Sequence, residues 1–369
     1  MACFYSGAFA MTAGQGQDAA PASTPERIVH GGSLEQAARL FPDAQLPWID
    51  LSTGINPHVY SRKPAPTWAL TRLPEPGLHV ALCNTAAEAW GVGQGAAVVA
   101  GPGTQMLLPQ VMMLVMPGVA AVLSPTYAEH RRAAAIAGHQ VREAQSVSAL
   151  YDADLVVVVN PNNPDGRALP REELLDLAAH LKRKRGLLVV DEAFIDASDV
   201  ESVTDCVGRE DVSGALIVLR SFGKFYGLAG VRLGFAIACR AHAERLEAIL
   251  GPWAVSGPAL VAGQAALADT PWRMAMRKRL AAEASRLDRM LIGAGLSIVG
   301  GTGLFRLARH DRAQTLFTIL AQHGVWVRRF EAESGLGADV LRFGLPPDKA
   351  AVRRVAQALD RFRATFNDG

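Results

Sequence analysis

The chain has 369 residues, of which 50% are hydrophobic and 20% are charged, a composition typical of a globular protein large enough for two domains. Its formal net charge of +2 is too small to favour a nucleic acid or an anionic membrane surface as its partner. No apolar run reaches the length of a membrane span, and the four cysteines contain no CxxC pair. The sequence therefore indicates neither a zinc ribbon nor a disulfide framework, and we expect a cytoplasmic protein without a metal.

The first 24 residues are predicted to be disordered, because they are rich in Ala, Gly, Ser and Gln. No Lys or Arg precedes Arg27, so the stretch lacks the basic start of a secretory signal. Met11 is a second candidate for the first residue of the natural protein.

Between residues 96 and 238, short apolar runs are mostly separated by helical patterns. The runs are rich in Val, Ile and Leu without polar alternation, as in buried parallel strands. A helical pattern over 170–185 begins with proline and acidic residues and ends with basic ones. This order predicts an α/β fold with a mainly parallel sheet. The six runs are 96–101, 120–125, 155–160, 186–194, 215–222 and 233–238.

The pattern changes beyond residue 250. A long helical stretch covers 276–291 and is followed by short strand-like runs, which predict a smaller α+β domain. We expect a large domain over 61–250 and a small domain made of 25–60 and 251–369. The late strand-like runs are LSIVGG, GLFRLA, VWVRRF and VLRFGL.

The segment GVGQGA at 91–96 resembles a dinucleotide-binding fingerprint. Such a fingerprint follows a strand and opens a helix. Here the segment follows a helical stretch and precedes a strand, so it is interpreted as a helix cap and a turn.

Polar motifs follow five of the predicted strands. Each has an ordinary structural alternative, since the Asn- and Pro-rich motif could be only a turn, Asp191 a helix cap and Tyr127 a packing residue. Ligands of α/β sheets bind beyond the carboxyl ends of the strands, and five such motifs on one edge favour a site. The motifs are GPGTQ (101–105), SPTY (124–127), NPNNPDG (160–166), DEAF (191–194) and SFGK (221–224).

These motifs supply what pyridoxal phosphate chemistry requires. Lys224 is the one lysine of six in an apolar, glycine-rich stretch, where desolvation lowers its pKa and makes the amine a nucleophile. Its amine can attach the cofactor. The Asp191 carboxylate can keep the pyridine nitrogen protonated. Asn163 can donate to the phenolate oxygen, and Tyr127 can stack on the ring.

The cofactor phosphate is predicted at the N-terminus of the helix that begins near Thr104, where backbone N–H groups are free. Gly103 and Gln105 belong to the same turn. Ser221 and Arg232 flank Lys224 in the sequence and can reach the same phosphate, the arginine through paired charge-assisted bonds.

With these motifs, the chain resembles the fold type I pyridoxal-phosphate enzymes of the aspartate-aminotransferase superfamily from about residue 28 to its C-terminus. Within it, the chain is similar to histidinol-phosphate aminotransferases and more similar to the L-threonine-O-3-phosphate decarboxylases of cobalamin biosynthesis. HGGSLEQAARLF (30–41) and WIDLSTGINP (48–57) carry the second similarity. The resemblance implies a homodimer that decarboxylates a phosphorylated amino acid. An aminotransferase for histidinol phosphate or an aromatic amino acid is the alternative, and a non-catalytic regulator is disfavoured because no helix-turn-helix or basic patch is present.

Two positions depart from the pattern of the aminotransferases. Phe194 stands where they usually have a tyrosine, which removes one hydroxyl donor to the phenolate and leaves more of that task to Asn163. Leu73 replaces a tyrosine that reaches the neighbouring subunit's phosphate, so that contact between subunits is in doubt.

The resemblance also implies the substrate residues. Arg342 matches the arginine that binds the substrate carboxylate, although a surface arginine on a strand is the alternative. Arg328 is the candidate for the substrate phosphate and Arg329 the weaker one, since neighbouring residues of a strand face opposite ways. The N-terminal motifs add three further candidates, His30, Gly54 and Ile55. Anchoring of the phosphate by Arg328 and His30 is expected to decide between decarboxylation and transamination.

Overall fold

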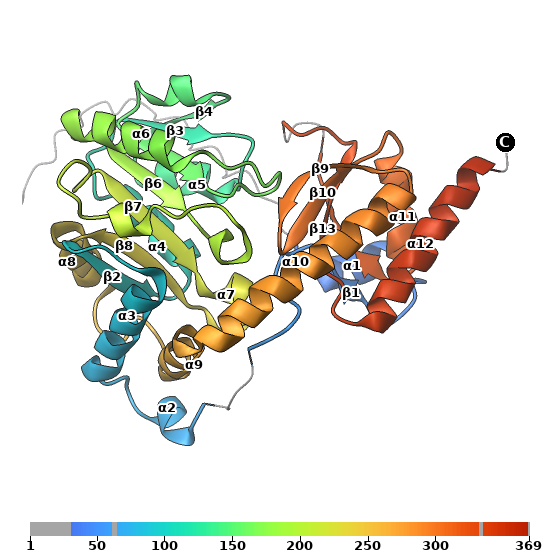
Figure 1. The fold of residues 1–369 in the computed structure, drawn as a ribbon, viewed down its shortest axis with the longest axis horizontal. Coiled ribbons are helices and arrows are strands. Elements are labelled where there is room, and N and C mark those ends of the chain that lie inside the picture. The colour runs from blue at the N-terminus through green and yellow to red at the C-terminus, as the bar shows by residue number, and fades with distance from the viewer. Residues whose placement is uncertain (1–30, 61–64, 332–334, 368–369) are drawn as a thin grey trace, which may run out of the picture.

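A computed structural model describes residues 31–60, 65–331 and 335–367. The stretch 1–24, predicted to be disordered, and His30 lie outside these residues. Figure 1 shows two lobes, a larger one around a seven-stranded sheet and a smaller one around a four-stranded sheet. In the part of the chain that the structure describes, no helix combines the length and the apolar character needed to cross a bilayer.

The seven-stranded sheet has the order β2-β8-β7-β6-β5-β3-β4. All pairs are parallel except those of β8, which runs antiparallel to both of its neighbours. The connection from β7 to β8 carries the short α7 (Phe222–Phe225) and stays at one edge of the sheet, so the chain returns in the opposite direction. The α/β fold with a mainly parallel sheet is confirmed. The strands are β2 (Ala96–Gly101), β3 (Val119–Leu123), β4 (Gln140–Ala144), β5 (Leu155–Val159), β6 (Leu187–Asp191), β7 (Leu216–Ser221) and β8 (Gly234–Cys239).

Both faces of this sheet are buried, which explains why its strands are apolar without alternation. Along β5, Val156 and Val158 belong to one core cluster, whereas Leu155 and Val157 belong to a second. Helices α3, α6, α9 and α10 contribute to the first cluster, and α4, α5 and α8 to the second. These helices are α3 (Pro76–Trp90), α4 (Thr104–Met112), α5 (Glu129–Ile136), α6 (Arg171–Arg183), α8 (Arg240–Leu250), α9 (Gly257–Ala268) and α10 (Thr270–Gly293).

The smaller lobe holds an antiparallel sheet of order β12-β13-β10-β9. The N-terminal strand β1 (Ile49–Asp50) joins this lobe by pairing with β11 (Val325–Trp326) in parallel. Helix α10 runs from the larger lobe to the smaller one (Figure 1). The domain boundaries at residues 60 and 250 stay a prediction. The other elements of this lobe are β9 (Ser297–Thr302), β10 (Phe305–Arg309), β12 (Arg328–Arg329), β13 (Val340–Gly344), α1 (Leu34–Leu40), α11 (Ala313–Gln322) and α12 (Lys349–Asn367).

The segment 91–96 is a helix cap and a turn, as the sequence predicted. Helix α3 ends at Trp90, and Gly91 caps it in the left-handed conformation with φ of 64°. Strand β2 then begins at Ala96. The segment therefore lacks the strand-turn-helix context of a dinucleotide fingerprint.

Candidate active site

The polar motifs converge because β2, β3, β5, β6 and β7 all point the same way, so their carboxyl ends meet at one edge of the sheet. Asp191 is the last residue of β6, and Lys224 lies in α7 (Phe222–Phe225) just after β7. Charge interactions connect Lys224 with Asp191, Arg232 and Arg342. Strand ends of the large lobe and residues of the small lobe therefore share one site.

Lys224 is partly buried between the lobes, with its Nζ 5.8 Å from the centre of the Phe194 ring. Burial, followed by the nearby Arg342 guanidinium, lowers the pKa of Lys224 to about 8, and Asp191 opposes this change. An amine with this pKa is deprotonated in an appreciable fraction near neutral pH, as a nucleophilic lysine requires.

Asp191 is fixed from two sides. One carboxylate oxygen accepts a hydrogen bond of 3.0 Å from the Ala193 N–H, and the other lies 3.0 Å from Nε2 of His130 in α5. His130 is fully buried. Sequence reasoning missed this histidine. Its position three residues after Tyr127, one helical turn further on, was the available signal.

Arg342 determines the orientation of Asn163. Its Nη1 donates to Oδ1 of Asn163, and its Nη2 donates to the carbonyl oxygen of Ser52 at 2.5 Å. The amide nitrogen of Asn163 is therefore left as the donor, as a contact to a phenolate oxygen requires. Arg342 is buried, and this burial, together with Arg328, lowers its pKa to about 10. Arg342 is therefore buried as a whole, unlike a surface arginine whose apolar part is covered while its charged end reaches solvent.

The Gln105 side chain lies between Tyr127 and Glu129. Its side-chain oxygen accepts from the Tyr127 hydroxyl at 3.1 Å, and its nitrogen donates to Glu129 at 2.7 Å. The side chain is thus directed at Tyr127 and Glu129, and only the backbone amide of Gln105 is left for a phosphate. Burial, Glu129 and Asp191 raise the pKa of Tyr127 to about 12, so its hydroxyl stays protonated.

Two glycines allow the start of α4 to lie close to its neighbours. Gly103 precedes the helix with φ of +86°, and a Cβ there would lie 2.8 Å from Nη2 of Arg232. A Cβ on Gly234 would lie 2.4 Å from the Thr104 nitrogen. Ser221, the last residue of β7, is half-buried. Free helix amides beside a guanidinium fit a phosphate group.

Arg328 and Arg329 face opposite ways. Arg328 lies directly across the β12-β13 ladder from Arg342, so these two side chains share one face of the sheet. Arg328 is half-buried, which lowers its pKa. Arg329 is exposed and pairs with Glu331 at 3.4 Å. Of the two candidates, Arg328 is therefore the one on the side of Arg342.

The N-terminal motif STGINP lies against the turn that carries Lys224. The Asn56 N–H donates to the Lys224 carbonyl oxygen at 3.0 Å. Gly54 is buried, and a Cβ there would approach the Phe305 ring to 3.2 Å. Ile55 is half-buried. Phe305 meets Phe194 edge to face, with the two ring centres 5.0 Å apart. Phe194 stands at the position where the aminotransferases usually have a tyrosine, so an aromatic pair without a hydroxyl occupies that place.

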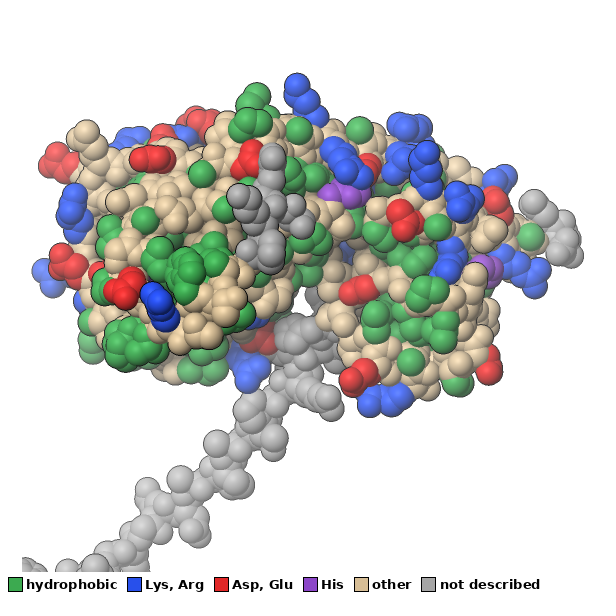
Figure 2. All heavy atoms as spheres, turned by 90° about the horizontal axis from the view of Figure 1, so that it is seen from below, with side chains coloured by type: hydrophobic (Ala, Val, Ile, Leu, Met, Phe, Trp, Pro, Cys, Tyr) green, Lys and Arg blue, Asp and Glu red, His purple; other side chains and the backbone are tan. Residues whose placement is uncertain are grey.

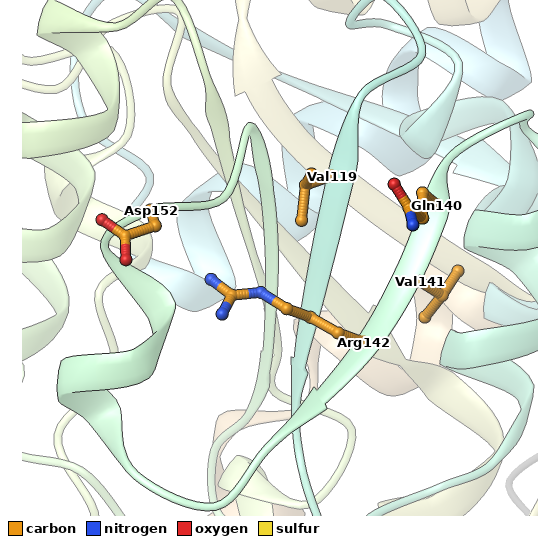
Figure 3. Close-up of a pocket in the computed structure, with 5 residues that line it drawn as sticks. All are labelled: Val119, Gln140, Val141, Arg142 and Asp152. Atoms are coloured by element: carbon orange, nitrogen blue, oxygen red, sulfur yellow. The ribbon is translucent and has the colours of Figure 1, made fainter.

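A cavity of about 330 Å³ lies elsewhere in the large lobe (Figure 3). The Arg142 guanidinium extends toward the side of the cavity on which Asp152 lies, and Val119 and Gln140 mark the beginnings of β3 and β4 there. Because these are the amino ends of the strands, the cavity belongs to the edge opposite Lys224. In the described ranges, no group of three or more His, Cys, Asp or Glu residues is arranged to hold a metal ion.

The chain matches the family model described as aminotransferase class I and II over residues 64–359. A threonine-phosphate decarboxylase of Pseudomonas aeruginosa is 42% identical over 341 residues, which cover 91% of this chain and 98% of that protein. A protein of the same name from a Sinorhizobium species is 41% identical and covers 90% and 98%. Histidinol-phosphate aminotransferase 1 of Bradyrhizobium diazoefficiens is 32% identical over 68% of this chain and 72% of its own length.

Solved structures share the fold. The histidinol-phosphate aminotransferase from Sinorhizobium meliloti, in complex with pyridoxal-5'-phosphate, has a TM-score of 0.74 at 21% identity and covers 95% of this chain and 99% of its own. The L-threonine-O-3-phosphate decarboxylase from Porphyromonas gingivalis has a TM-score of 0.69 at 22% identity, covering 85% and 98%. The fold type I architecture predicted from the sequence is confirmed.

Proposed function

This chain belongs to the aminotransferase class I and II family, and from that premise we propose that it decarboxylates L-threonine O-3-phosphate to (R)-1-aminopropan-2-yl phosphate and CO2, a step of cobalamin biosynthesis. Its cofactor is pyridoxal 5'-phosphate. The observation that carries the choice of substrate is the pair of arginines, Arg342 and Arg328, opposite each other on β13 and β12. One guanidinium suits the substrate carboxylate, and a second on the same face suits a phosphate.

The residues at the sheet edge fit the cofactor. When bound, pyridoxal phosphate withdraws electrons from the bonds at the Cα of the amino acid. Lys224 attaches the cofactor covalently, and Asp191, fixed by His130, keeps a proton on the ring nitrogen. Asn163 donates its side-chain N–H to the phenolate oxygen, and Tyr127 covers the ring. Gly103, Thr104, the Gln105 backbone amide, Ser221 and Arg232 hold the phosphate at the start of α4.

The charges around Lys224 suit a substrate with two anionic groups. Lys224, Arg232, Arg328 and Arg342 bring four positive charges, and Asp191 and Asp50 bring two negative ones. Pairing with a carboxylate and a phosphate compensates for the cost of burying Arg342 and half-burying Arg328.

Substrate orientation selects the bond that breaks. Arg328 would hold the substrate phosphate and Arg342 the carboxylate, with Gly54 and Ile55 beside them, and this orientation would favour loss of the carboxylate. His30, a further candidate for the phosphate, lies outside the described residues. The cofactor, when bound, would take up the electron pair of the broken bond, and a proton would then have to be added at Cα. The Lys224 amine, released from the cofactor when the substrate amine takes its place, would be the group placed to deliver that proton.

One incubation distinguishes the two candidate reactions. The protein with bound cofactor is mixed with L-threonine O-3-phosphate in the absence of a keto acid, and CO2 and the amino alcohol phosphate are measured. The proposal expects both products in equal amounts. Formation of no CO2, together with amino transfer from histidinol phosphate once a keto acid is added, would establish the aminotransferase instead.

We also propose a homodimer in the cytoplasm. Large apolar side chains are exposed around α2 (Thr67–Thr71) and α3, and Figure 2 shows hydrophobic side chains gathered on the left half of that view. A contiguous exposed apolar surface marks an interface. Leu73, at the position of the missing tyrosine, is 64% exposed in this area. The apolar patch comprises the exposed large apolar side chains of α2, of α3 and of the residues between them, namely Trp68, Leu70, Leu73 and Val80.

A further inference from the structure

Ser52 joins three distant parts of the chain beside the site. It is buried, and its N–H and its hydroxyl both donate to Oδ1 of Asp50, at 2.8 and 2.6 Å. The hydroxyl oxygen also accepts from the Gly32 N–H at 2.7 Å, and the carbonyl oxygen accepts from Arg342 at 2.5 Å. All the polar groups of Ser52 are therefore used, and Asp50 fixes two of them.

The two glycines of the HGG motif permit this contact. A Cβ on Gly31 would lie 2.6 Å from the Ser52 carbonyl oxygen, which is too close for any other residue. Gly32 has φ of +89°, a conformation that favours glycine. The motif thus brings the backbone of the N-terminal segment directly onto Ser52.

The backbone around Asp50 and Ser52 is held between two strands of the small lobe. The Leu51 N–H donates to Trp326 in β11 at 2.7 Å, and the Leu51 carbonyl accepts from Gly344 at the end of β13 at 2.6 Å. Arg342 belongs to the same strand β13. The unit formed by Asp50 and Ser52 is therefore fixed relative to the strand that carries the arginine.

We propose that Asp50 is a positioning residue that, through Ser52, aims the Arg342 guanidinium at the substrate carboxylate. Its carboxylate oxygen holds the Ser52 turn so that the carbonyl faces Nη2, while Asn163 holds Nη1. The guanidinium then has a fixed plane, and bidentate pairing with a carboxylate requires a fixed plane. This inference rests on the proposed function, since it assigns the carboxylate of that substrate to Arg342.

Two substitutions separate geometry from charge. Asp50→Asn keeps an acceptor oxygen at the same place and removes the charge, whereas Asp50→Glu keeps the charge and displaces the oxygen by one methylene. Asp43→Glu, at an exposed residue just before β1, is the matched control. For each enzyme with bound cofactor we measure KM and kcat for L-threonine O-3-phosphate and the inhibition constant of the product amino alcohol phosphate, which has no carboxylate.

The proposal expects Asp50→Glu to raise KM about tenfold, as the loss of one or two hydrogen bonds predicts. In Asp50→Glu, the inhibition constant of the product should stay within about threefold of the parent value, because the product has no carboxylate to pair with Arg342. Asp50→Asn should keep the KM of the parent within the same margin, because it retains the acceptor oxygen. The idea is overturned if Asp50→Glu weakens substrate and product equally, or if Asp50→Asn is the more harmful change. Failure of the proposed function is a separate result, namely no CO2 from the parent enzyme.

Discussion

Single residues of the candidate site were predictable where their chemistry is unusual for their surroundings. Lys224 stood out as a lysine in an apolar stretch, and Asp191 as a carboxylate at the end of a buried strand. Gln105 shows the limit of this reasoning, because its side chain is directed by Glu129, which is 24 positions away. His130 and Ser52 were not found for the same reason, since their roles depend on contacts that only the folded chain creates.

The lowered pKa of Lys224 predicts a pH-dependent stability of the cofactor-free protein. The pKa is about 8 in the folded chain and 10.5 for an ordinary lysine, so between these pH values the unfolded chain binds more protons. Stability then rises with pH across this window, and below pH 8 the charged, buried lysine destabilises the fold. Lys224→Met should therefore melt at a higher temperature than the parent at pH 7, and the difference should shrink toward pH 10.5.

Thermal unfolding followed by circular dichroism at several pH values measures this difference. Lys278→Met serves as the control, because Lys278 is exposed on α10 and its loss removes the same charge. A difference between Lys224→Met and the parent that stays constant with pH would contradict the assignment of a lowered pKa to this lysine.

The hydrogen bond from Tyr127 to Gln105 predicts that these residues act as a unit. Tyr127→Phe and Gln105→Leu each remove it, and each should raise the dissociation constant of the cofactor about fivefold, the effect of about one hydrogen bond. The double variant should be no weaker than either single variant. Titration of the cofactor-free protein with pyridoxal phosphate measures all three. Additive effects would mean that the Gln105 side chain contributes to cofactor binding independently of the Tyr127 hydroxyl.

At the scale of elements, the sequence predicted the strands that are buried on both faces. It missed β4, whose residues QVREA are half polar because the strand lies at the edge of the sheet. It also missed β1, since a strand of two residues has no periodicity. The reversed direction of β8 was not predicted either, because a buried antiparallel strand is as apolar as a parallel one.

The register of β12 against β13 gives a prediction about two neighbouring arginines. Arg328 shares a face with Arg342, so Arg328→Ala should lower kcat/KM for L-threonine O-3-phosphate by about 30-fold to several thousand-fold, equivalent to about 2–5 kcal/mol. Cofactor absorbance should be unchanged, since the proposed site of the cofactor phosphate is formed by Arg232 and the start of α4. Arg329→Ala is the control and should change kcat/KM less than about threefold, because the side chain is exposed on the other face. Equal losses in both variants would contradict the assignment of the phosphate to Arg328.

At the scale of the whole molecule, the N-terminal segment is packed with the C-terminal lobe rather than with the large sheet that follows it in the chain. The pairing of β1 with β11 brings residues 49–50 to 325–326, and the contacts of Ser52 add residue 32 and Arg342. The motifs HGG, STGINP and LRFGL therefore meet although they lie far apart in the sequence. The sequence suggested this association only through the family resemblance, since no local pattern specifies a contact between segments so far apart.

The apolar patch around α2 and α3 predicts where a second copy binds. Leu70 is 71% exposed and Leu73 64% exposed, and an aspartate at each would place two charges in an apolar interface, where burial of an unpaired charge is unfavourable. Leu70→Asp combined with Leu73→Asp should therefore convert the proposed dimer to a monomer in light scattering coupled to gel filtration. Ile136→Asp is the matched control, because Ile136 is also 64% exposed but ends α5, at the far end of the large lobe from α2 (Figure 1). The control should stay dimeric. A dimer that survives the double substitution, or a parent protein that is monomeric at all concentrations, would show that this surface does not bind a second copy.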